Sequence, residues 1–452
     1  MNSVAVESAG AARAAGKGKL LRVLGVVFGL AVTIGITIGM GILRTPGEIA
    51  GRLPSAPLFL GVWLAGGLYA LLGANSLSEL SAMIPRSGGY YVFARRGCGE
   101  YVGFVIGWSD WLSTCGTTAI LAMVFAEYVG IFLPRLAGRG VPVALAVVVG
   151  FALLQWRGVR WGSRTQVVTS LLKAITFAVL IAACFLFDVK DTTGEGARLV
   201  APTGWPLVTA FVLSLQAVLY TYDGWASTVY FGEEVREPGR DIPRAMLGGV
   251  ASVIAIYVLV NAALLRVLPW SRLAGEKLAV GAAAEVLFGA AGAFVLGTIA
   301  VVSTLSAVNG NTLCAPRIIY AMSRDGLFSR RAAVVNRGGT PTVTLLLSTV
   351  VTALFILTGT LDKVLAVLAF FFVTNYTVCF IAVFVLRRRE PETARPYRAR
   401  GYPWTNALAL VCSVTFLAGA AWGDTRNSLH SLVILAASYP TFRALKWFAR
   451  ER

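Results

Sequence analysis

Apolar stretches of about 20 residues recur along this whole sequence, and they restrict the possible fold more than any other feature. A helix of that length crosses a bilayer. Because lipid offers the backbone no hydrogen bonds, each crossing segment must be helical. We predict an all-α integral membrane protein with twelve transmembrane helices and no separate soluble domain. The predicted spans are 21–52, 57–84, 101–133, 141–156, 164–187, 206–231, 246–268, 281–316, 341–359, 362–386, 404–423 and 429–447.

Composition and charge placement agree with a membrane protein. Hydrophobic residues make up 57% of the chain and charged residues only 14%, too little polar surface for a soluble protein. The net charge of +18 raises the alternative of nucleic-acid binding. With the N-terminus inside, however, most lysines and arginines fall in cytoplasmic loops, as the positive-inside rule requires. We therefore predict an inner (plasma) membrane protein with both termini cytoplasmic, contacts with lipid headgroups, and no nucleic-acid partner.

The sequence holds no pattern typical of an enzyme or a metal site. Its six cysteines are scattered without a CxxC pair, and His430 is its single histidine. It also contains no Ser-His-Asp arrangement, phosphate-binding loop or HExxH motif. We predict no enzymatic activity, no cofactor and no metal.

Two of the predicted spans are interrupted. Residues 35–48 read GITIGMGILRTPGE, and three glycines within seven residues make a helix easy to unwind, because each costs about 1 kcal/mol. Residues 219–234 read LYTYDGWASTVYFGEE, with Asp223-Gly224 inside the apolar run. These breaks fall in spans 1 and 6, which suggests an inverted repeat of 21–187 and 206–386. Two further spans (404–447) and short cytoplasmic termini (1–20 and 448–452) complete the predicted organisation.

Such breaks are typical of a transport site at the membrane midplane. The freed N–H groups of a half-helix can hold an anionic group, and freed carbonyls can hold an ammonium. A zwitterionic amino acid carries one of each. Two broken helices packed side by side therefore fit an amino acid substrate.

Four motifs resemble those of the amino acid–polyamine–organocation transporters, most closely the L-type amino acid transporters and their bacterial relatives. The first motif is GITIGMGIL, with Leu43 where the family usually has Phe. The others are IPRSGGYYVFARRGCGEYVGF (84–104), LYTYDGWASTVYFGEEVREPGRDIPRA (219–245) and NGNTLCAPRIIYAMSRDGLF (309–328). They lie in register over nearly the whole chain. The resemblance implies a five-plus-five inverted repeat with two extra helices, and transport by alternating access.

The resemblance also implies a substrate site at the two breaks. It places the carboxylate on the span 1 backbone, at Ile38, Gly39, Met40, Gly41 and Ile42. It places the amine on span 6 carbonyls, at Tyr220, Thr221 and Asp223. Tyr220 matches an outer gating position that more often holds Phe or Trp, and Asn375 matches a polar position near the pocket.

Lys173, near the centre of span 5, is costly to bury and should face the interior with oxygen partners. The resembling family has a lysine here, in the place of a sodium ion found in more distant relatives. We expect Lys173 to bridge span 5 to span 1 carbonyls and to remove the need for sodium. A second possibility is that it carries a proton.

Other charged residues have narrower interpretations. Asp223 either binds a substrate ammonium or caps a half-helix at 225–232, and the cap is favoured. Glu234 is expected to close an inner gate by pairing with one or two of the loop arginines, which are Arg86, Arg95, Arg96, Arg236, Arg240, Arg244, Arg317 and Arg324. Glu48 is a possible partner of Arg44 or Arg52. Asp110 and Glu127 should face the interior or a headgroup region.

The leading hypothesis is a sodium-independent amino acid transporter, working as an exchanger or a proton symporter. The alternatives are a polyamine or organic cation transporter and a membrane sensor that does not transport. Some relatives join a single-span glycoprotein through a cysteine after span 3. The corresponding loop, LPRLAGRGVP, has no cysteine, so no disulfide-linked subunit is expected.

Overall fold

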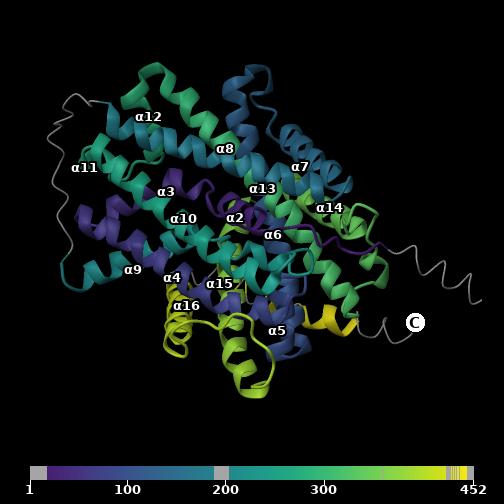
Figure 1. Ribbon diagram of the computed structural model, residues 1–452. Helices are drawn as coiled ribbons and strands as arrows, with labels where there is room; N and C mark the ends of the chain where they lie inside the picture. Colours follow the sequence, from purple (N-terminus) through teal and green to yellow (C-terminus); the bar gives the residue numbers. More distant parts are fainter. Residues whose placement is uncertain are drawn as a thin grey trace, which may run out of the picture.

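The computed structural model describes residues 18–187, 203–359, 361–423 and parts of 429–444. In this part the chain is a bundle of helices with isolated β-bridges and no β-strand (Figure 1). Most of the predicted N-terminal tail, the predicted C-terminus (448–452), much of the span at 429–447 and His430 lie outside the described residues.

Helices coincide with the predicted spans up to residue 423. The first half contains α2 (Val26–Thr37), α3 (Gly41–Arg52), α4 (Ala56–Met83), α6 (Glu100–Phe132), α7 (Gly140–Trp156) and α8 (Val159–Leu186). The second half contains α9 (Trp205–Thr221), η2 (Ser227–Tyr230), α10 (Pro238–Val267), α13 (Gly292–Arg324), α14 (Thr342–Thr358), α15 (Leu361–Arg389) and α16 (Trp404–Gly423). Three short helices lie in connections: α5 (Tyr90–Cys98), α11 (Trp270–Leu273) and α12 (Ala279–Phe288).

The helices have the length and hydropathy of a multi-pass membrane protein. Seven described helices are long and apolar enough to cross a bilayer, or eight if the bent pair α2 and α3 is one span. Three shorter apolar helices, α7, α9 and α14, accompany them. The count of twelve spans and the inverted repeat stay predictions.

Two predicted spans have wrong boundaries. Helix α10 begins at Pro238, eight residues before the predicted start of the span 246–268. The apolar run 281–316 is divided, because α12 ends at Phe288 and a short 3-10 turn, Gly289–Ala291, precedes α13. Gly289 takes φ +56°, a conformation that favours glycine, so the helix stops there although the run stays apolar. The helix that follows extends to Arg324, eight residues beyond the predicted end.

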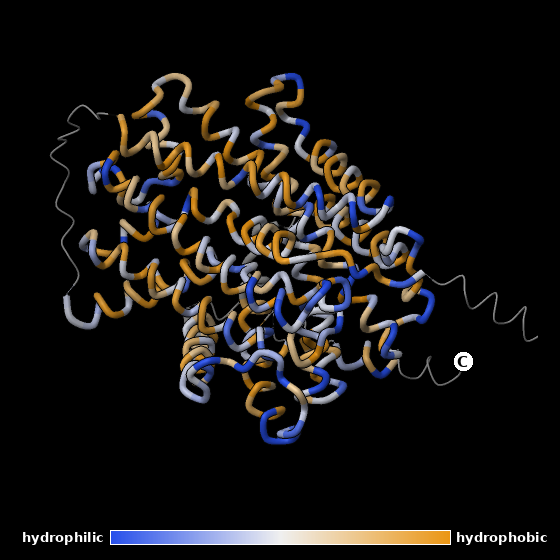
Figure 2. Tube along the Cα trace, viewed as in Figure 1, coloured by the Kyte–Doolittle hydropathy of each residue, from blue (hydrophilic) through white to orange (hydrophobic). Residues whose placement is uncertain are grey.

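The burial pattern of α8 indicates which environment the outer surface of the bundle suits. Its buried face carries polar groups, including Gln166, Ser170 and Lys173. Its exposed face is apolar, with Leu171 60% and Val179 61% exposed. This inside-out amphipathicity suits a lipid environment, and Figure 2 shows hydrophobic residues along the helices and hydrophilic ones gathered at connections.

The inner layer of the bundle positions the candidate site. Helix α2 packs against α8, α10 and α13, while α13 packs along α6 and α10 along α4. The break after α2 is thereby enclosed (Figure 1). We use "inner end" for the end of the bundle that carries the α4–α5, α13–α14 and α15–α16 connections, which the sequence predicts to face the cytoplasm.

Candidate functional site

The first break is present where the glycines predict it. Helix α2 ends at Thr37, α3 begins at Gly41, and the two axes differ by 48°. Among the described residues, helix α3 leaves the N–H groups of Gly41 and Ile42 without a backbone partner, while the Leu43 N–H donates to the Met40 carbonyl at 3.1 Å. A Cβ on Gly41 would lie 2.8 Å from the Thr221 side chain, so glycine lets the two broken spans approach. This places the N-terminus of α3 beside the end of α9.

The second break follows α9, which ends at Thr221. Gly224 has φ +100°, and a Cβ there would lie 2.7 Å from Ile36. The predicted half-helix at 225–232 is wrong: the segment forms only a 3-10 turn, Ser227–Tyr230, whose N-cap is Ala226. Asp223 is therefore not its cap, and its carboxylate instead accepts a hydrogen bond from the Tyr376 hydroxyl.

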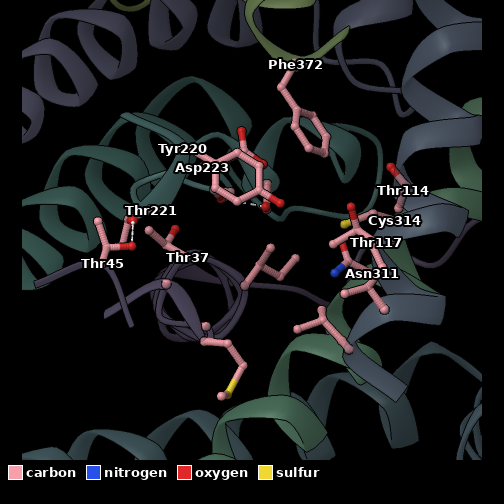
Figure 3. A pocket seen from close by; sticks show the side chains of 18 of the residues that line it. Thr37, Thr45, Thr114, Thr117, Tyr220, Thr221, Asp223, Asn311, Cys314 and Phe372 are labelled. Atoms are coloured by element: carbon pink, nitrogen blue, oxygen red, sulfur yellow. Dashed lines mark hydrogen bonds between the residues drawn. The ribbon is translucent and has the colours of Figure 1, made fainter. Parts of the chain in front are cut away.

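Direct contacts join the two breaks. The Thr45 and Thr221 hydroxyls lie 3.0 Å apart (Figure 3). The buried Tyr257 hydroxyl lies 2.8 Å from the Thr37 carbonyl and 2.9 Å from the Thr221 carbonyl. Because a tyrosine has one O–H hydrogen, it donates to one of these carbonyls at a time. The ends of α2 and α9 thus present carbonyl oxygens side by side.

Lys173 contacts the first break as predicted. Its ammonium is fully buried and donates to the Gly35 and Ile38 carbonyls, each at 2.6 Å. Within the described residues it has no ion pair with a carboxylate. Nearby, Ser170 donates to the Ala31 carbonyl at 2.6 Å, so α8 is joined to α2 at two levels.

A cavity of about 410 Å³ opens beside both breaks. Six of the predicted substrate residues line it: Gly39, Met40, Gly41, Tyr220, Thr221 and Asp223. Three predicted residues do not line it: Ile38, Ile42 and Asn375. Asn375 is buried and accepts a hydrogen bond from Ser109, while its neighbours Phe372 and Tyr376 face the cavity from the same helix.

The opposite wall was missed by sequence reasoning. It is formed by small polar side chains and tyrosines of α5, α6, η2 and α13, shown in part in Figure 3. They are Tyr90, Thr114, Thr117, Tyr230, Asn311 and Cys314. Thr114 and Thr117 lie one turn apart on α6, but hydroxyl residues are common in membrane helices, so this spacing alone gave no signal.

Several ion pairs gather at the inner end of the bundle. Glu234 pairs with Arg317 at 2.5 Å, and their side chains are 0% and 2% exposed. The guanidinium also lies over the Phe231 ring, 4.5 Å from its centroid. The predicted pairing of Glu234 is therefore confirmed, with Arg317 as its partner.

More exposed pairs surround this one. Glu233 pairs with Arg324 at 2.6 Å, and Asp325 pairs with Arg86 at 2.9 Å and Arg95 at 2.8 Å. We call these pairs, with Glu234–Arg317, the inner ion-pair layer. At the other end of the bundle Glu48 pairs with Arg52 at 2.7 Å, one of its two predicted partners.

The remaining acidic residues of α6 differ from each other. Asp110 is 0% exposed and faces the interior, as one of the two predicted alternatives requires. Glu127 is exposed and borders a separate hollow near the outer end.

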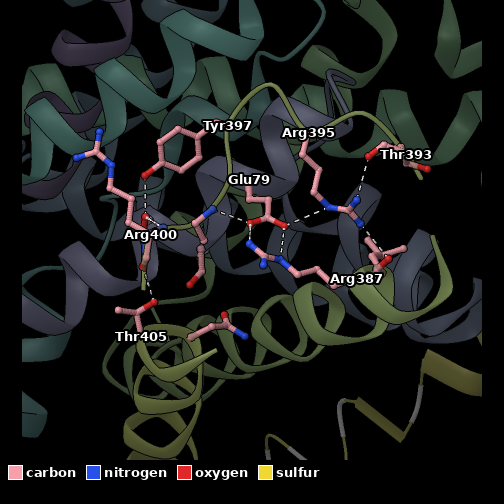
Figure 4. Close-up of polar contacts among 12 residues, drawn as sticks. Glu79, Arg387, Thr393, Arg395, Tyr397, Arg400 and Thr405 are labelled. Carbon is pink, nitrogen blue, oxygen red and sulfur yellow. Dashed lines mark hydrogen bonds and ion pairs between the residues drawn. The ribbon is translucent and has the colours of Figure 1, made fainter. Parts of the chain in front are cut away.

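A second buried carboxylate holds the α15–α16 connection. Glu79 of α4, 2% exposed, pairs with Arg387 at 2.5 Å and Arg395 at 3.3 Å (Figure 4). It also accepts a hydrogen bond from the Ala399 backbone at 2.7 Å. One turn earlier, Asn75 accepts from the Arg400 backbone at 3.0 Å. The connection is thereby fixed to the inner end of α4.

Glu79→Gln should lower the apparent melting temperature of the detergent-solubilised protein. Arg395 is only 5% exposed, and leaving a buried charge unpaired costs about 3–5 kcal/mol. The matched control is Glu285→Gln, whose carboxylate is 69% exposed and pairs with Arg272, a pair worth about 0–1 kcal/mol. Equal losses in the two variants would contradict a stabilising role for the Glu79 cluster.

The sequence as a whole matches a known family model. Residues 20–440 match the model described as "Amino acid permease". The chain belongs to the amino acid permease family. This permease is 29% identical over 436 residues to the serine/threonine exchanger SteT of Bacillus subtilis, covering 94% of this chain and 97% of that protein.

Two mammalian relatives extend the comparison. The permease is 27% identical over 394 residues to the human b(0,+)-type amino acid transporter 1, covering 84% of this chain and 79% of the relative. It is 27% identical over 393 residues to the mouse Asc-type amino acid transporter 1, covering 84% and 73%. The resemblance to L-type transporters is thus confirmed, and the chain is a membrane transporter and not an enzyme.

Proposed function

We propose that this permease moves amino acids across the inner membrane by alternating access, independently of sodium, as an exchanger or a proton symporter. The observation that carries the proposal is the pair of breaks beside one cavity. The N–H groups at the start of α3 offer a site for the substrate carboxylate. The carbonyls at the ends of α2 and α9 offer a site for its ammonium.

Lys173 supports sodium independence. A sodium site needs several oxygen ligands, and here two carbonyls of the first break already accept hydrogen bonds from the lysine ammonium at 2.6 Å. The side chain thus brings its own positive charge to the place where carbonyl oxygens gather. We propose that Lys173 takes the position of a sodium ion.

The two ends of the cavity suggest which gate is closed. The inner ion-pair layer lies beneath it, while Arg44 and Glu48 of α3 line it toward the outer end. We propose that this conformation is closed inside, with Glu234 as an inner gate residue and Tyr220 as the outer one.

The polar wall favours small hydroxyl or amide side chains on the substrate. Thr117 Oγ1 and Asn311 Nδ2 line the cavity and have no hydrogen-bond partner among the described residues. A site whose polar groups need partners discriminates against substrates that lack them. The printed activity of the B. subtilis relative, serine/threonine exchange, agrees with this. Organic cations are the second candidate class of substrate, because the Asp223 carboxyl group lines the cavity.

Purified protein in liposomes tests the proposal. Liposomes preloaded with unlabelled serine should take up radiolabelled serine or threonine, with the same rate in sodium and in choline buffers. A proton symporter should also load empty liposomes under an inward proton gradient. Uptake of putrescine but of no amino acid would contradict the proposal and favour an organic cation transporter. Binding without uptake would instead support a sensor.

A disulfide-linked subunit is not expected, and full activity of the single chain would agree with this.

A further inference from the structure

Asp110 is a buried carboxyl group that the proposed substrate site does not use. It is 0% exposed, and Oδ1 accepts a hydrogen bond from the Tyr230 hydroxyl at 2.8 Å. Its other oxygen, Oδ2, is buried without a partner among the described residues. Glu79 and Glu234 are equally buried, but each is paired with arginine. Asp110 has no lysine or arginine in ion-pair distance in the described chain.

The position of Asp110 lies between the cavity and the inner ion-pair layer. Thr114, one turn further along α6, lines the cavity and donates to the Asp110 carbonyl at 2.8 Å. Tyr230 also lines the cavity, and it precedes Glu234 by only four residues. The Asp110–Tyr230 hydrogen bond therefore connects α6 to the segment whose glutamates close the inner end.

Among the described residues, the side chains that interact electrostatically with Asp110 include no lysine or arginine. An ionised carboxylate with a single donor and no exposed surface costs several kcal/mol to bury. The nearest arginine along α13, Arg317, is already paired with Glu234. The titratable groups that interact with Asp110 come from α5, the second break, α13 and α15, and all are hydroxyl, thiol or carboxyl groups: Tyr90, Asp223, Tyr230, Cys314 and Cys379.

We propose that Asp110 is a proton-binding site over which the inner gate closes, so that the carrier must hold a proton there to reach the closed conformation. The inference rests on the proposed alternating access and adds a ligand to it. When the inner ion-pair layer opens, water reaches Asp110, its O–H bond breaks, and the proton passes to water. The carboxylate then stays hydrated, and it takes a proton back from the same side before the gate closes.

Because the proton leaves and returns on the same side, this step moves no net proton across the membrane. It makes the rate of closure depend on the pH at the inner end. Above the midpoint of titration, the protonated fraction of a single site falls tenfold for each pH unit. Exchange that needs closure should fall with the same slope.

The first experiment measures exchange in proteoliposomes with equal pH on both sides, from pH 5.5 to 8.5. We expect wild-type exchange to fall by up to tenfold per pH unit at the alkaline end. Asp110→Asn, which has the shape of the protonated acid, should exchange at a rate that does not change with pH. Glu127→Gln, the exposed carboxyl of the same helix, should keep the wild-type profile. A folded Asp110→Asn that is inactive at every pH, or that keeps the wild-type profile, would overturn the proposal.

Tyr230→Phe gives a second, independent variant. It removes only the donor that stabilises the ionised carboxylate, so the fall in exchange should move to higher pH. A structural role alone would change the rate without moving this midpoint. An unchanged midpoint would therefore count against the proposal even if Asp110→Asn failed to fold.

A labelling experiment separates this inference from the proposed transport. Cys314 lines the cavity, so in a variant without the other five cysteines its modification from the inner side reports gate opening without any substrate. The labelling rate with Asp110 present, divided by that of Asp110→Asn in the same cysteine background, should rise with pH. The ionised Asp110 carboxylate by itself disfavours the Cys314 thiolate and would lower this ratio, so a rise reports gate opening. A ratio that stays constant would overturn the proton site while leaving transport intact. A rising ratio in a protein that moves no amino acid would instead overturn the proposed function alone.

Discussion

Lys173→Met should reduce amino acid exchange by about 30-fold or more while leaving the protein folded. The substitution keeps an unbranched side chain as far as Cε but removes the ammonium that donates to the Gly35 and Ile38 carbonyls. Each buried carbonyl left without a partner costs about 1–3 kcal/mol, so the first break loses at least about 2 kcal/mol of support. Exchange rates in proteoliposomes, at saturating substrate and in sodium-free buffer, measure the loss.

Lys277→Met is the matched control for this variant. Its ammonium is exposed in the connection before α12, so the same change of side chain should leave exchange within twofold of wild type. The wild-type rate should not change when sodium replaces choline. A wild-type rate that requires sodium, or a fully active Lys173→Met, would contradict the role of Lys173 as a sodium substitute.

The helix breaks could be predicted because their cause is local. Glycines in an apolar run weaken the helix wherever they occur, and both interruptions lie where Gly39–Gly41 and Asp223-Gly224 predict them. The contact of Lys173 was predictable for a similar reason, since a buried ammonium must find oxygen atoms. The carbonyls that it contacts belong to the helix end that the glycines expose.

The remaining contacts and boundaries could not be predicted, because they depend on how the helices pack against one another. The sequence offered Glu234 eight arginines, and only the packing of α13 selects Arg317. Asp223 looked like a helix cap, but the following turn starts too late, and the Tyr376 hydroxyl from a distant span reaches it instead. The division of span 281–316 was hidden because Gly289 and its neighbours are as apolar as the helices around them.

Arg317→Met should open the inner gate and stop exchange. It leaves the Glu234 carboxylate buried without its partner, which costs about 3–5 kcal/mol and lowers the ratio of closed to open protein by a factor on the order of 10²–10⁴. Modification of Cys314 by a membrane-impermeant thiol reagent from the inner side should become correspondingly faster. The background lacks the other five cysteines, so the label reports this one position.

Two further variants make the result specific to the buried pair. Arg324→Met breaks the exposed pair with Glu233, whose contribution is about 0–1 kcal/mol, so labelling should change by less than tenfold. In the double variant Glu234→Gln/Arg317→Met, the unpaired charge is gone, and much of the closed state should return. This recovery would show that the penalty in Arg317→Met comes from the buried carboxylate, because the lost arginine contacts are the same in both variants. If the double variant labels as fast as Arg317→Met, the gate depends on Arg317 itself, through its position over Phe231, and not on the charge pair.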